Sequence, residues 1–227
     1  MKVVIPAGGK GSRLFPYTDL IPIALLPVGG KPVIWWIAQN LMKHGFEDII
    51  ICINKEHTEN FRYELRDYKT NMTIIENDRP LGSAGEILGA KDIIKEAFLL
   101  HYSDELTPVN LTELVRFHKV RKTSIGTLAV IKNVPLDVGI VEIENNRIKN
   151  LVEKPMLDRP AWAGIAVFEP EIFDYIKIGD DFSMNIFPKV LQSKKKLFAY
   201  KSPVFWYDVG SISHYKRVCN LAKQGKL

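Results

Sequence analysis

Cysteine is scarce in this chain of 227 residues, since Cys52 and Cys219 are its only two. Two isolated cysteines form neither a disulfide framework nor a metal-binding spacing, which favours a reduced, cytoplasmic protein. Long apolar runs are also missing, because none reaches the ~20 residues that cross a bilayer. The first apolar run is interrupted by Gly-Gly-Lys-Gly at residues 8–11, where a signal peptide would stay apolar. We therefore expect no membrane partner.

Charge of one sign is not in large excess. The 31 Lys and Arg side chains outnumber the 26 Asp and Glu side chains slightly, which gives a net charge of +5. The densest basic run, residues 194–196, is too short to indicate a nucleic-acid surface. Spread positive charge does suit a substrate that carries phosphates. With 46% hydrophobic residues, the chain can bury a core without disulfide bonds.

Strand-like and helix-like segments alternate through the first half of the chain. Such alternation is typical of a parallel sheet covered on both faces. The expected strands are 2–7, 49–53, 72–76, 98–102 and 124–132, and the expected helices are 33–44, 56–68, 86–95 and 111–122. In the second half, strands are expected at 138–143, 147–153, 162–168, 197–200 and 204–207, and helices at 169–176, 184–192 and 211–223. These segments predict one mixed-sheet α/β domain over residues 1–227, with a β-rich second half.

A glycine-rich loop follows the first expected strand. Gly8, Gly9 and Gly11 expose backbone N–H groups that a polyanion can approach, and Arg13 adds a permanently charged fork for phosphate oxygens. The loop is neither a Walker A motif nor the dinucleotide fingerprint. A phosphate-binding loop at the carboxyl end of the first strand is one interpretation. A plain strand-to-loop turn is the other.

Two aspartates stand at the ends of expected strands. Asp104 follows the fourth strand, and Asp208 follows the aromatic run at residues 205–207. Carboxylates in a phosphate site supply the hard oxygen ligands that Mg²⁺ prefers, with phosphate and water completing its shell. A single aspartate at the end of a strand is, however, more often a loop cap than a metal ligand.

Taken together, seven segments occur in the order found in one family. They are the loop at 8–18, Leu-Pro-Val-Gly-Gly-Lys-Pro at 26–32, Leu-Gly-Ser-Ala-Gly at 81–85, Asp104, Glu-Lys-Pro at 153–155, Ala-Gly at 163–164 and Trp-Tyr-Asp-Val-Gly at 206–210. The chain resembles the sugar-1-phosphate nucleotidylyltransferases, also called nucleoside-diphosphate-sugar pyrophosphorylases, from residue 2 to about 222. The resemblance implies an α/β, Rossmann-like, mixed and mostly parallel sheet flanked by helices. It also implies the reaction NTP + sugar 1-phosphate → NDP-sugar + pyrophosphate.

The resemblance assigns roles to individual residues. The nucleotide-binding residues would be Ala7, Gly8, Gly9, Gly11, Ser12, Arg13, Gly82 and Ser83. The sugar-phosphate-binding residues would be Glu153, Lys154, Trp162 and Gly164, in a second half of about 123–227 that follows a nucleotide-binding half of about 1–122. Asp104 and Asp208 would hold Mg²⁺, and Arg13, Lys154 and Asp104 would be catalytic. In-line attack at phosphorus requires positioning and charge neutralisation, and it needs no protein nucleophile.

The chain departs from the family pattern at several positions. Ile23 stands where the family usually has a phosphate-contacting lysine, and Tyr102-Ser103 stands where an Asn-Gly pair usually precedes the metal-binding Asp104. Trp162 replaces an asparagine, and Ser183 and Asn185 replace two acids. We also expect no left-handed β-helix domain, which many relatives of the family add.

These departures leave two classes of function open. One is an Mg²⁺-dependent nucleotidylyltransferase, of reduced or altered activity because of Ile23. The other is a non-catalytic regulatory relative that binds a nucleotide or a sugar nucleotide. The overall resemblance favours GTP with a mannose-like 1-phosphate, then glucose 1-phosphate with dTTP or UTP. The sequence names neither the base nor the acceptor, and a homo-oligomer stays open.

Overall fold

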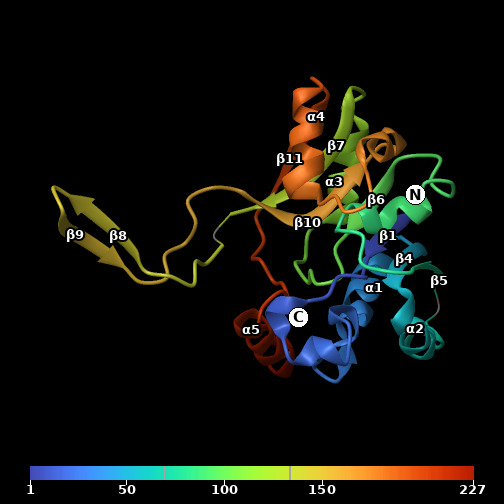
Figure 1. Ribbon diagram of the computed structural model, residues 1–227, viewed down its shortest axis with the longest axis horizontal. Helices are drawn as coiled ribbons and strands as arrows, with labels where there is room; N and C mark the ends of the chain where they lie inside the picture. The colour runs from blue at the N-terminus through green and yellow to red at the C-terminus, as the bar shows by residue number, and fades with distance from the viewer. Residues whose placement is uncertain (69, 133) are drawn as a thin grey trace.

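The apolar, β-branched run after Lys2 forms β1 (Val3–Pro6), which lies inside a seven-stranded sheet (Figure 1). The computed structural model describes residues 1–68, 70–132 and 134–227. The sheet has the order β11-β7-β10-β6-β1-β4-β5. The other strands are β4 (Asp48–Asn54), β5 (Asn71–Asn77), β6 (Phe98–His101), β7 (Ser124–Ile131), β10 (Ala161–Phe168) and β11 (Lys196–Ser202).

The sheet is mixed and mostly parallel, as the sequence predicts. β1 pairs parallel with β4 and β6, β4 pairs parallel with β5, and β11 pairs parallel with β7. β10 alone is antiparallel to its neighbours β6 and β7. Because β1, β4, β5 and β6 run in one direction, the loops that follow them emerge at the same edge.

Successive side chains of β1 point to opposite faces of the sheet and enter two separate cores. Val3 and Ile5 pack with helices α1, α2, α3 and α5, whereas Val4 packs with α4 and the short helices around it. The helices are α1 (Val33–Lys43), α2 (Thr58–Leu65), α3 (Leu111–Lys119), α4 (Phe187–Gln192) and α5 (Ile212–Lys223). Ser211 is the N-cap of α5, because its side-chain oxygen accepts the His214 N–H, which confirms the expected start of that helix.

Three expected elements differ from the structure. The segment 86–95 begins as a 3₁₀ helix (Gly85–Ala90) and continues as turns, so the expected α-helix was wrong. A 3₁₀ helix (Pro170–Tyr175) likewise replaces the helix expected at 169–176. The segment 204–207 is no strand of the sheet. It leads instead to Asp208, whose backbone forms an isolated antiparallel β-bridge with Glu105.

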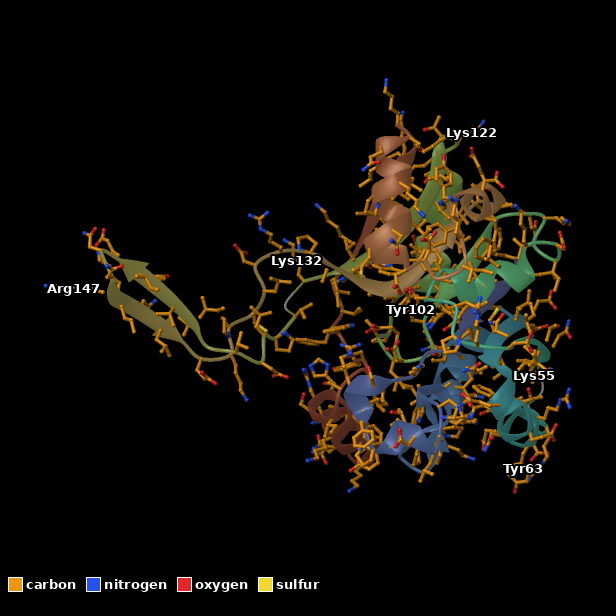
Figure 2. The ribbon with its side chains drawn as sticks, viewed as in Figure 1. Lys55, Tyr63, Tyr102, Lys122, Lys132 and Arg147 are labelled. Carbon is orange, nitrogen blue, oxygen red and sulfur yellow. The ribbon has the colours of Figure 1, made fainter. Side chains whose placement is uncertain are left out.

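Residues 135–156 form an arm that extends from the body (Figure 1). Its hairpin pairs β8 (Ile140–Glu144) with β9 (Arg147–Val152). Asn145 and Asn146 both have positive φ, which confirms the turn expected at residues 144–147. Every residue of β8 and β9 is exposed, and Figure 2 shows Arg147 at the far end from Tyr102.

No helix among the described residues has both the length and the apolarity needed to cross a membrane.

Candidate functional site

The loop after β1 requires glycine at position 11. Gly11 has φ +59°, and a Cβ there would lie 2.7 Å from a Thr18 methyl carbon and 2.9 Å from Ile23 Cγ1. The Thr18 hydroxyl also donates to the Gly11 carbonyl at 2.9 Å. This turn leads into a 3₁₀ helix (Ser12–Leu14), in which Leu14 is buried while Ser12 and Arg13 are exposed.

A hollow of about 130 Å³ opens at the carboxyl ends of β1 and β6. It is lined by Pro6, Ala7, Gly9, Ile23, Ser83, Tyr102, Ser103 and Asp104. Both glycine-bearing loops and the first aspartate therefore meet in one place. A Cβ on Gly9 would meet nothing within 4 Å, so that stretch of backbone is accessible to a ligand.

The second aspartate lies beside the first. The Val209 N–H donates to the Asp104 carbonyl at 2.8 Å, and the backbone of Asp208 forms an isolated antiparallel β-bridge with that of Glu105. Burial and the neighbouring Asp208 carboxylate raise the pKa of Asp104 to about 6. Two carboxylates that repel each other in this way form an anionic pair that a cation would stabilise.

Arg13 lies near the same pair. A Cβ added to Gly210 would be 3.1 Å from an Arg13 guanidinium nitrogen and 2.6 Å from Asp208 Oδ2. The Arg13 charge also acts on Asp104 and opposes the rise of its pKa. The loop after β1 thus places a cation beside the carboxylates that the resemblance assigns to metal binding.

His214 is a site residue that the sequence analysis did not identify. Its Nδ1 lies 2.5 Å from Asp208 Oδ1, and the Gly210 N–H donates to Asp208 Oδ2 at 3.0 Å. His214 belongs to the first turn of α5, which the Ser211 N-cap starts. The only sequence signal was therefore the position of a histidine just after the predicted cap.

The second glycine loop packs against the segment before α4. Gly82 has φ +77°, and a Cβ there would lie 2.5 Å from the Asp180 carbonyl oxygen. Both the backbone N–H and the hydroxyl of Ser83 donate to Asp181 Oδ1, at 3.2 and 2.8 Å. The loop conformation is therefore fixed by residues about a hundred positions further along the chain.

Glu86 connects the two loops, and sequence analysis missed it. The Gly8 N–H donates to Glu86 Oε2 at 2.9 Å, and Glu86 is only 4% exposed. Burial raises the pKa of Glu86 to about 7, against the opposing effect of the Gly8 hydrogen bond, and the charge of Asp181 raises it further. A buried carboxylate thus occupies one N–H group of the first glycine loop.

The four residues assigned to sugar-phosphate binding lie in two different places. Gly164 has φ +69°, and a Cβ there would lie 2.8 Å from Glu105 Cγ. The Trp162 indole donates to the Ile165 carbonyl at 3.0 Å and packs edge-on against Tyr102. Glu153 and Lys154 instead lie on the arm and are exposed. The structure therefore brings two of these residues toward the hollow and leaves the other two on the arm.

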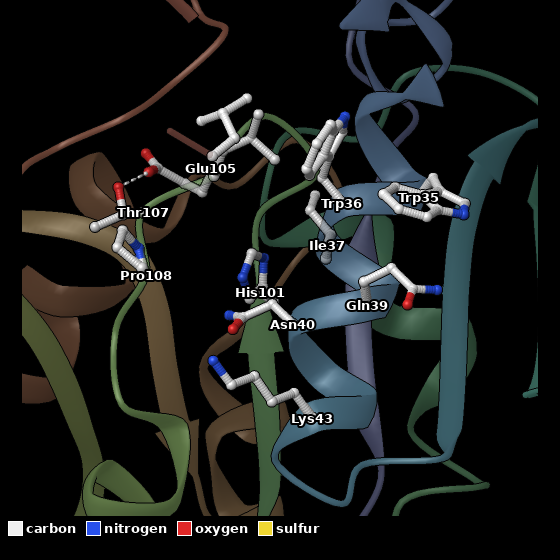
Figure 3. Close-up of a pocket in the computed structure, with 12 residues that line it drawn as sticks. Trp35, Trp36, Ile37, Gln39, Asn40, Lys43, His101, Glu105, Thr107 and Pro108 are labelled. Carbon is white, nitrogen blue, oxygen red and sulfur yellow. Dashed lines mark hydrogen bonds between the residues drawn. The ribbon is translucent and has the colours of Figure 1, made fainter. Parts of the chain in front are cut away.

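A second, larger cavity of about 390 Å³ is lined by α1, the end of β6 and the segment after it (Figure 3). Trp36, Lys43 and His101 line it, together with the buried Glu105. Glu105 Oε1 and Oε2 both accept from the Trp206 indole, at 3.0 and 3.1 Å, and burial raises the pKa of Glu105 well above its usual value. None of the glycine-loop residues lines this cavity, so we place the candidate site in the smaller hollow.

Asp104, which lines the hollow, and Asp208, which lies beside Asp104, form a donor set that fits Mg²⁺ bound together with a substrate. Asp104 and Asp208 offer carboxylate oxygens, and across residues 1–68, 70–132 and 134–227 no cluster of three or more His, Cys, Asp or Glu side chains could hold a metal by itself. Mg²⁺ is commonly held by one or two carboxylates, with substrate phosphates and water as its other ligands. These two residues would hold the ion.

Comparison with known proteins places the chain among nucleotide-using transferases. A family model described as nucleotidyl transferase matches residues 2–225. The chain is 30% identical to a UTP–glucose-1-phosphate uridylyltransferase of Synechocystis, over 95% of the chain and 61% of that protein. It is also 30% identical to a mannose-1-phosphate guanyltransferase of Saccharomyces cerevisiae, over 92% of the chain and 61% of the relative. It therefore spans about three fifths of both relatives.

The solved structure of HddC from Yersinia pseudotuberculosis has the same fold. It superposes with a TM-score of 0.77, covering 96% of this chain and 98% of that one, at 21% identity.

Proposed function

The chain belongs to the nucleotidyl transferase family, and we propose that it transfers a nucleoside monophosphate from an NTP to a sugar 1-phosphate and releases pyrophosphate. The observation that carries the proposal is the hollow at the ends of β1 and β6, in which two glycine loops meet Asp104. The relatives named above act on glucose 1-phosphate or mannose 1-phosphate, which supports a sugar 1-phosphate as the acceptor.

The residues of the hollow suit binding of a triphosphate. The accessible backbone at Gly9 and the exposed Arg13 would bind phosphate oxygens, the arginine through charge-assisted hydrogen bonds. Asp104 and Asp208 would hold Mg²⁺, which when bound neutralises charge on the phosphates during transfer. His214 and the Gly210 N–H fix the orientation of the Asp208 carboxylate. Transfer would then depend on positioning and electrostatics alone.

The acceptor phosphate needs a cation of its own. Lys154 is our proposed ligand for it, and its exposed side chain makes no ion pair with the residues that the structure describes. Ile23 cannot substitute, because it contributes only apolar atoms to the wall of the hollow. Lys10 is our candidate for the missing charge, because it is exposed in the first glycine loop, which would hold the triphosphate.

Pyrophosphate release measured with four NTPs against several sugar 1-phosphates, with Mg²⁺ present, tests the proposal. GTP with mannose 1-phosphate is the first pair to test, and glucose 1-phosphate with dTTP or UTP is the next. Asp104→Asn should lower turnover by about 10³-fold, the scale of lost transition-state charge stabilisation. Asp174→Asn, at an exposed ion pair with Lys91, is the matched control and should keep full turnover. Absence of pyrophosphate release with every pair would refute an enzyme.

A non-catalytic nucleotide-binding protein is the second candidate, and Ile23 is the observation that favours it. Such a protein would bind an NTP without releasing pyrophosphate, and Ile23→Lys would restore some turnover. We further propose three properties of the protein. They are a cytoplasmic location, a homo-oligomeric state, and a division into a nucleotide-binding half (about 1–122) and a sugar-phosphate-binding half (about 123–227). The two free cysteines support the first of these.

A further inference from the structure

Glu86 is a buried carboxylate with no role in the site described so far. It comes directly after the second glycine loop, and its Oε2 accepts an N–H from the first. The residue that it binds, Gly8, lies between Ala7 and Gly9, which both line the hollow, so the carboxylate is held next to that stretch of the candidate nucleotide site. Within the described part of the chain, no hydrogen bond to Glu86 Oε1 is found.

Charge changes sign along the first glycine loop. The loop begins at Gly8, against the Glu86 carboxylate, and ends at Arg13, beside Asp104 and Asp208. A triphosphate is repelled by the first end and attracted by the second, where Arg13 and a metal ion would neutralise it. The charges therefore orient a bound NTP with its base toward Glu86.

The backbone near Glu86 is closely packed. A Cβ on Gly8 would lie 3.2 Å from the Asn54 backbone nitrogen and 3.3 Å from Glu86 Oε1. The Asn77 amide donates to the Glu86 carbonyl at 3.1 Å. The Asn77 bond fixes the Glu86 backbone, and the Gly8 N–H and burial fix its carboxylate, so Glu86 presents a fixed acceptor rather than a mobile surface charge.

An ionised carboxylate only accepts hydrogen bonds, and this selects among bases. Guanine presents two adjacent donors, N1–H and the N2 amino group, which match the two oxygens of a carboxylate. Uracil and thymine present one N–H between two carbonyl oxygens. A carboxylate repels these oxygens, because both groups only accept hydrogen bonds. In adenine and cytosine the amino group adjoins a ring nitrogen that is itself an acceptor.

We propose that Glu86 determines base specificity, accepting hydrogen bonds from the N1–H and N2 amino group of guanine, so that the nucleotide used by this protein is GTP. The inference rests on the proposed function, and it names the substrate that the proposed reaction would use. Oε1 would accept one of the two guanine donors, and Oε2 would accept the other through the lone pair that its bond to the Gly8 N–H leaves free.

Equilibrium binding of nucleotides to the wild-type protein gives the first test. Calorimetry with Mg²⁺ at pH 8, above the pKa of about 7 that burial gives Glu86, should rank GTP at least 100-fold above UTP. ITP, which lacks the N2 amino group, should bind about 10-fold or more weaker than GTP, since it loses one charge-assisted hydrogen bond. Equal affinity for GTP and ITP, or a preference for UTP or dTTP, would overturn the proposal without any variant.

Glu86→Gln gives the second test. Its amide keeps the size of the side chain and can still accept the Gly8 N–H, but it turns an NH₂ group toward the donors of guanine. The ratio of GTP to UTP affinity should fall 10-fold or more. Glu76→Gln, which neutralises a carboxylate on β5 that pairs with Arg62, is the matched control and should leave the ratio unchanged.

The two proposals fail in different ways. Pyrophosphate release at similar rates from GTP, UTP and CTP would leave the transferase standing and reject Glu86 as the specificity residue. Failure of any NTP to bind would reject both.

Discussion

β10 and the hairpin of the arm follow each other in the chain and both contain isoleucine and valine, yet they differ completely in burial. Six of the eight residues of β10 are buried between β6 and β7, whereas every residue of β8 and β9 is exposed. The paired residues Val141 and Leu151, and Ile143 and Ile148, place four apolar side chains on one face of the hairpin. Apolar, β-branched composition thus predicts a strand, while only a neighbouring strand or helix decides whether it contributes to a core.

The same difference divides the candidate site. Arg13, Asp104 and Asp208 are placed by loops anchored on the central sheet. Lys154 comes two residues after β9, and its backbone N–H donates to Val138 on the arm. Contacts of Asp137 join the arm to α5, because its Oδ2 accepts from the Ser213 hydroxyl at 3.1 Å and lies 3.7 Å from His214 Nε2. The foot of the arm is therefore tied to the helix whose histidine holds Asp208.

The largest effect is expected when one isoleucine in each region is truncated to alanine. Ile165→Ala in β10 removes a fully buried side chain and should lower the free energy of unfolding by about 2–5 kcal/mol. Ile143→Ala on the arm, where the side chain is 68% exposed, should change it by less than about 0.5 kcal/mol. Urea denaturation measures both. A loss above 1 kcal/mol for Ile143→Ala would show that the arm packs against another surface in solution.

Removal of the arm's lysine tests whether the arm takes part in the reaction. Lys154→Ala should lower kcat/KM for the sugar 1-phosphate about 10²-fold, the usual cost of one lost charge contact to a reacting group. NTP affinity and thermal stability should not change, because the side chain is exposed. Lys149→Ala, on the same hairpin, is the control and should behave as wild type. Equal turnover in both variants would exclude Lys154 from the site.

Much of the fold could be read from the sequence, because buried parallel strands leave a strong local signal. The glycine loop was predicted as backbone open to a polyanion; Gly9 does face open space, whereas Gly11 is required by the turn itself, since it has a positive φ and no room for a side chain. The segment 204–207 was misread as a strand, because its aromatic residues have strand-like composition. The path of this segment depends instead on the isolated β-bridge between Asp208 and Glu105, which are far apart in the sequence.

The parts of the site that escaped prediction depend on contacts between distant residues. Glu86 meets Gly8 across 78 positions, and Ser83 meets Asp181 across 98. Neither pair leaves a local pattern. His214 was missed for a related reason: the sequence predicts the start of α5, whereas the approach of that helix to Asp208 depends on how the chain crosses the body.

The smallest expected effect concerns the pH dependence of stability, which should also separate the two regions. Burial raises the pKa of Glu86 to about 7 in the folded protein, from an ordinary value of 4.5. Between these two pH values the folded state therefore binds the proton more tightly than the unfolded state does. The stability that this proton contributes is fully present below about pH 4.5 and is lost as the pH rises through 7. Asp104, whose pKa is raised to about 6, adds a further loss of stability as the pH rises.

Glu86→Gln should remove the Glu86 part of this loss, because an amide does not titrate. Relative to wild type, the variant should gain on the order of 2 kcal/mol in unfolding free energy between pH 4.5 and pH 8. Glu142→Gln, whose side chain is exposed on the arm, should run parallel to wild type across the same range. Urea titrations at several pH values measure the three curves. Parallel curves for Glu86→Gln and wild type would mean that the Glu86 carboxylate is solvated in the folded protein, contrary to its burial against Gly8.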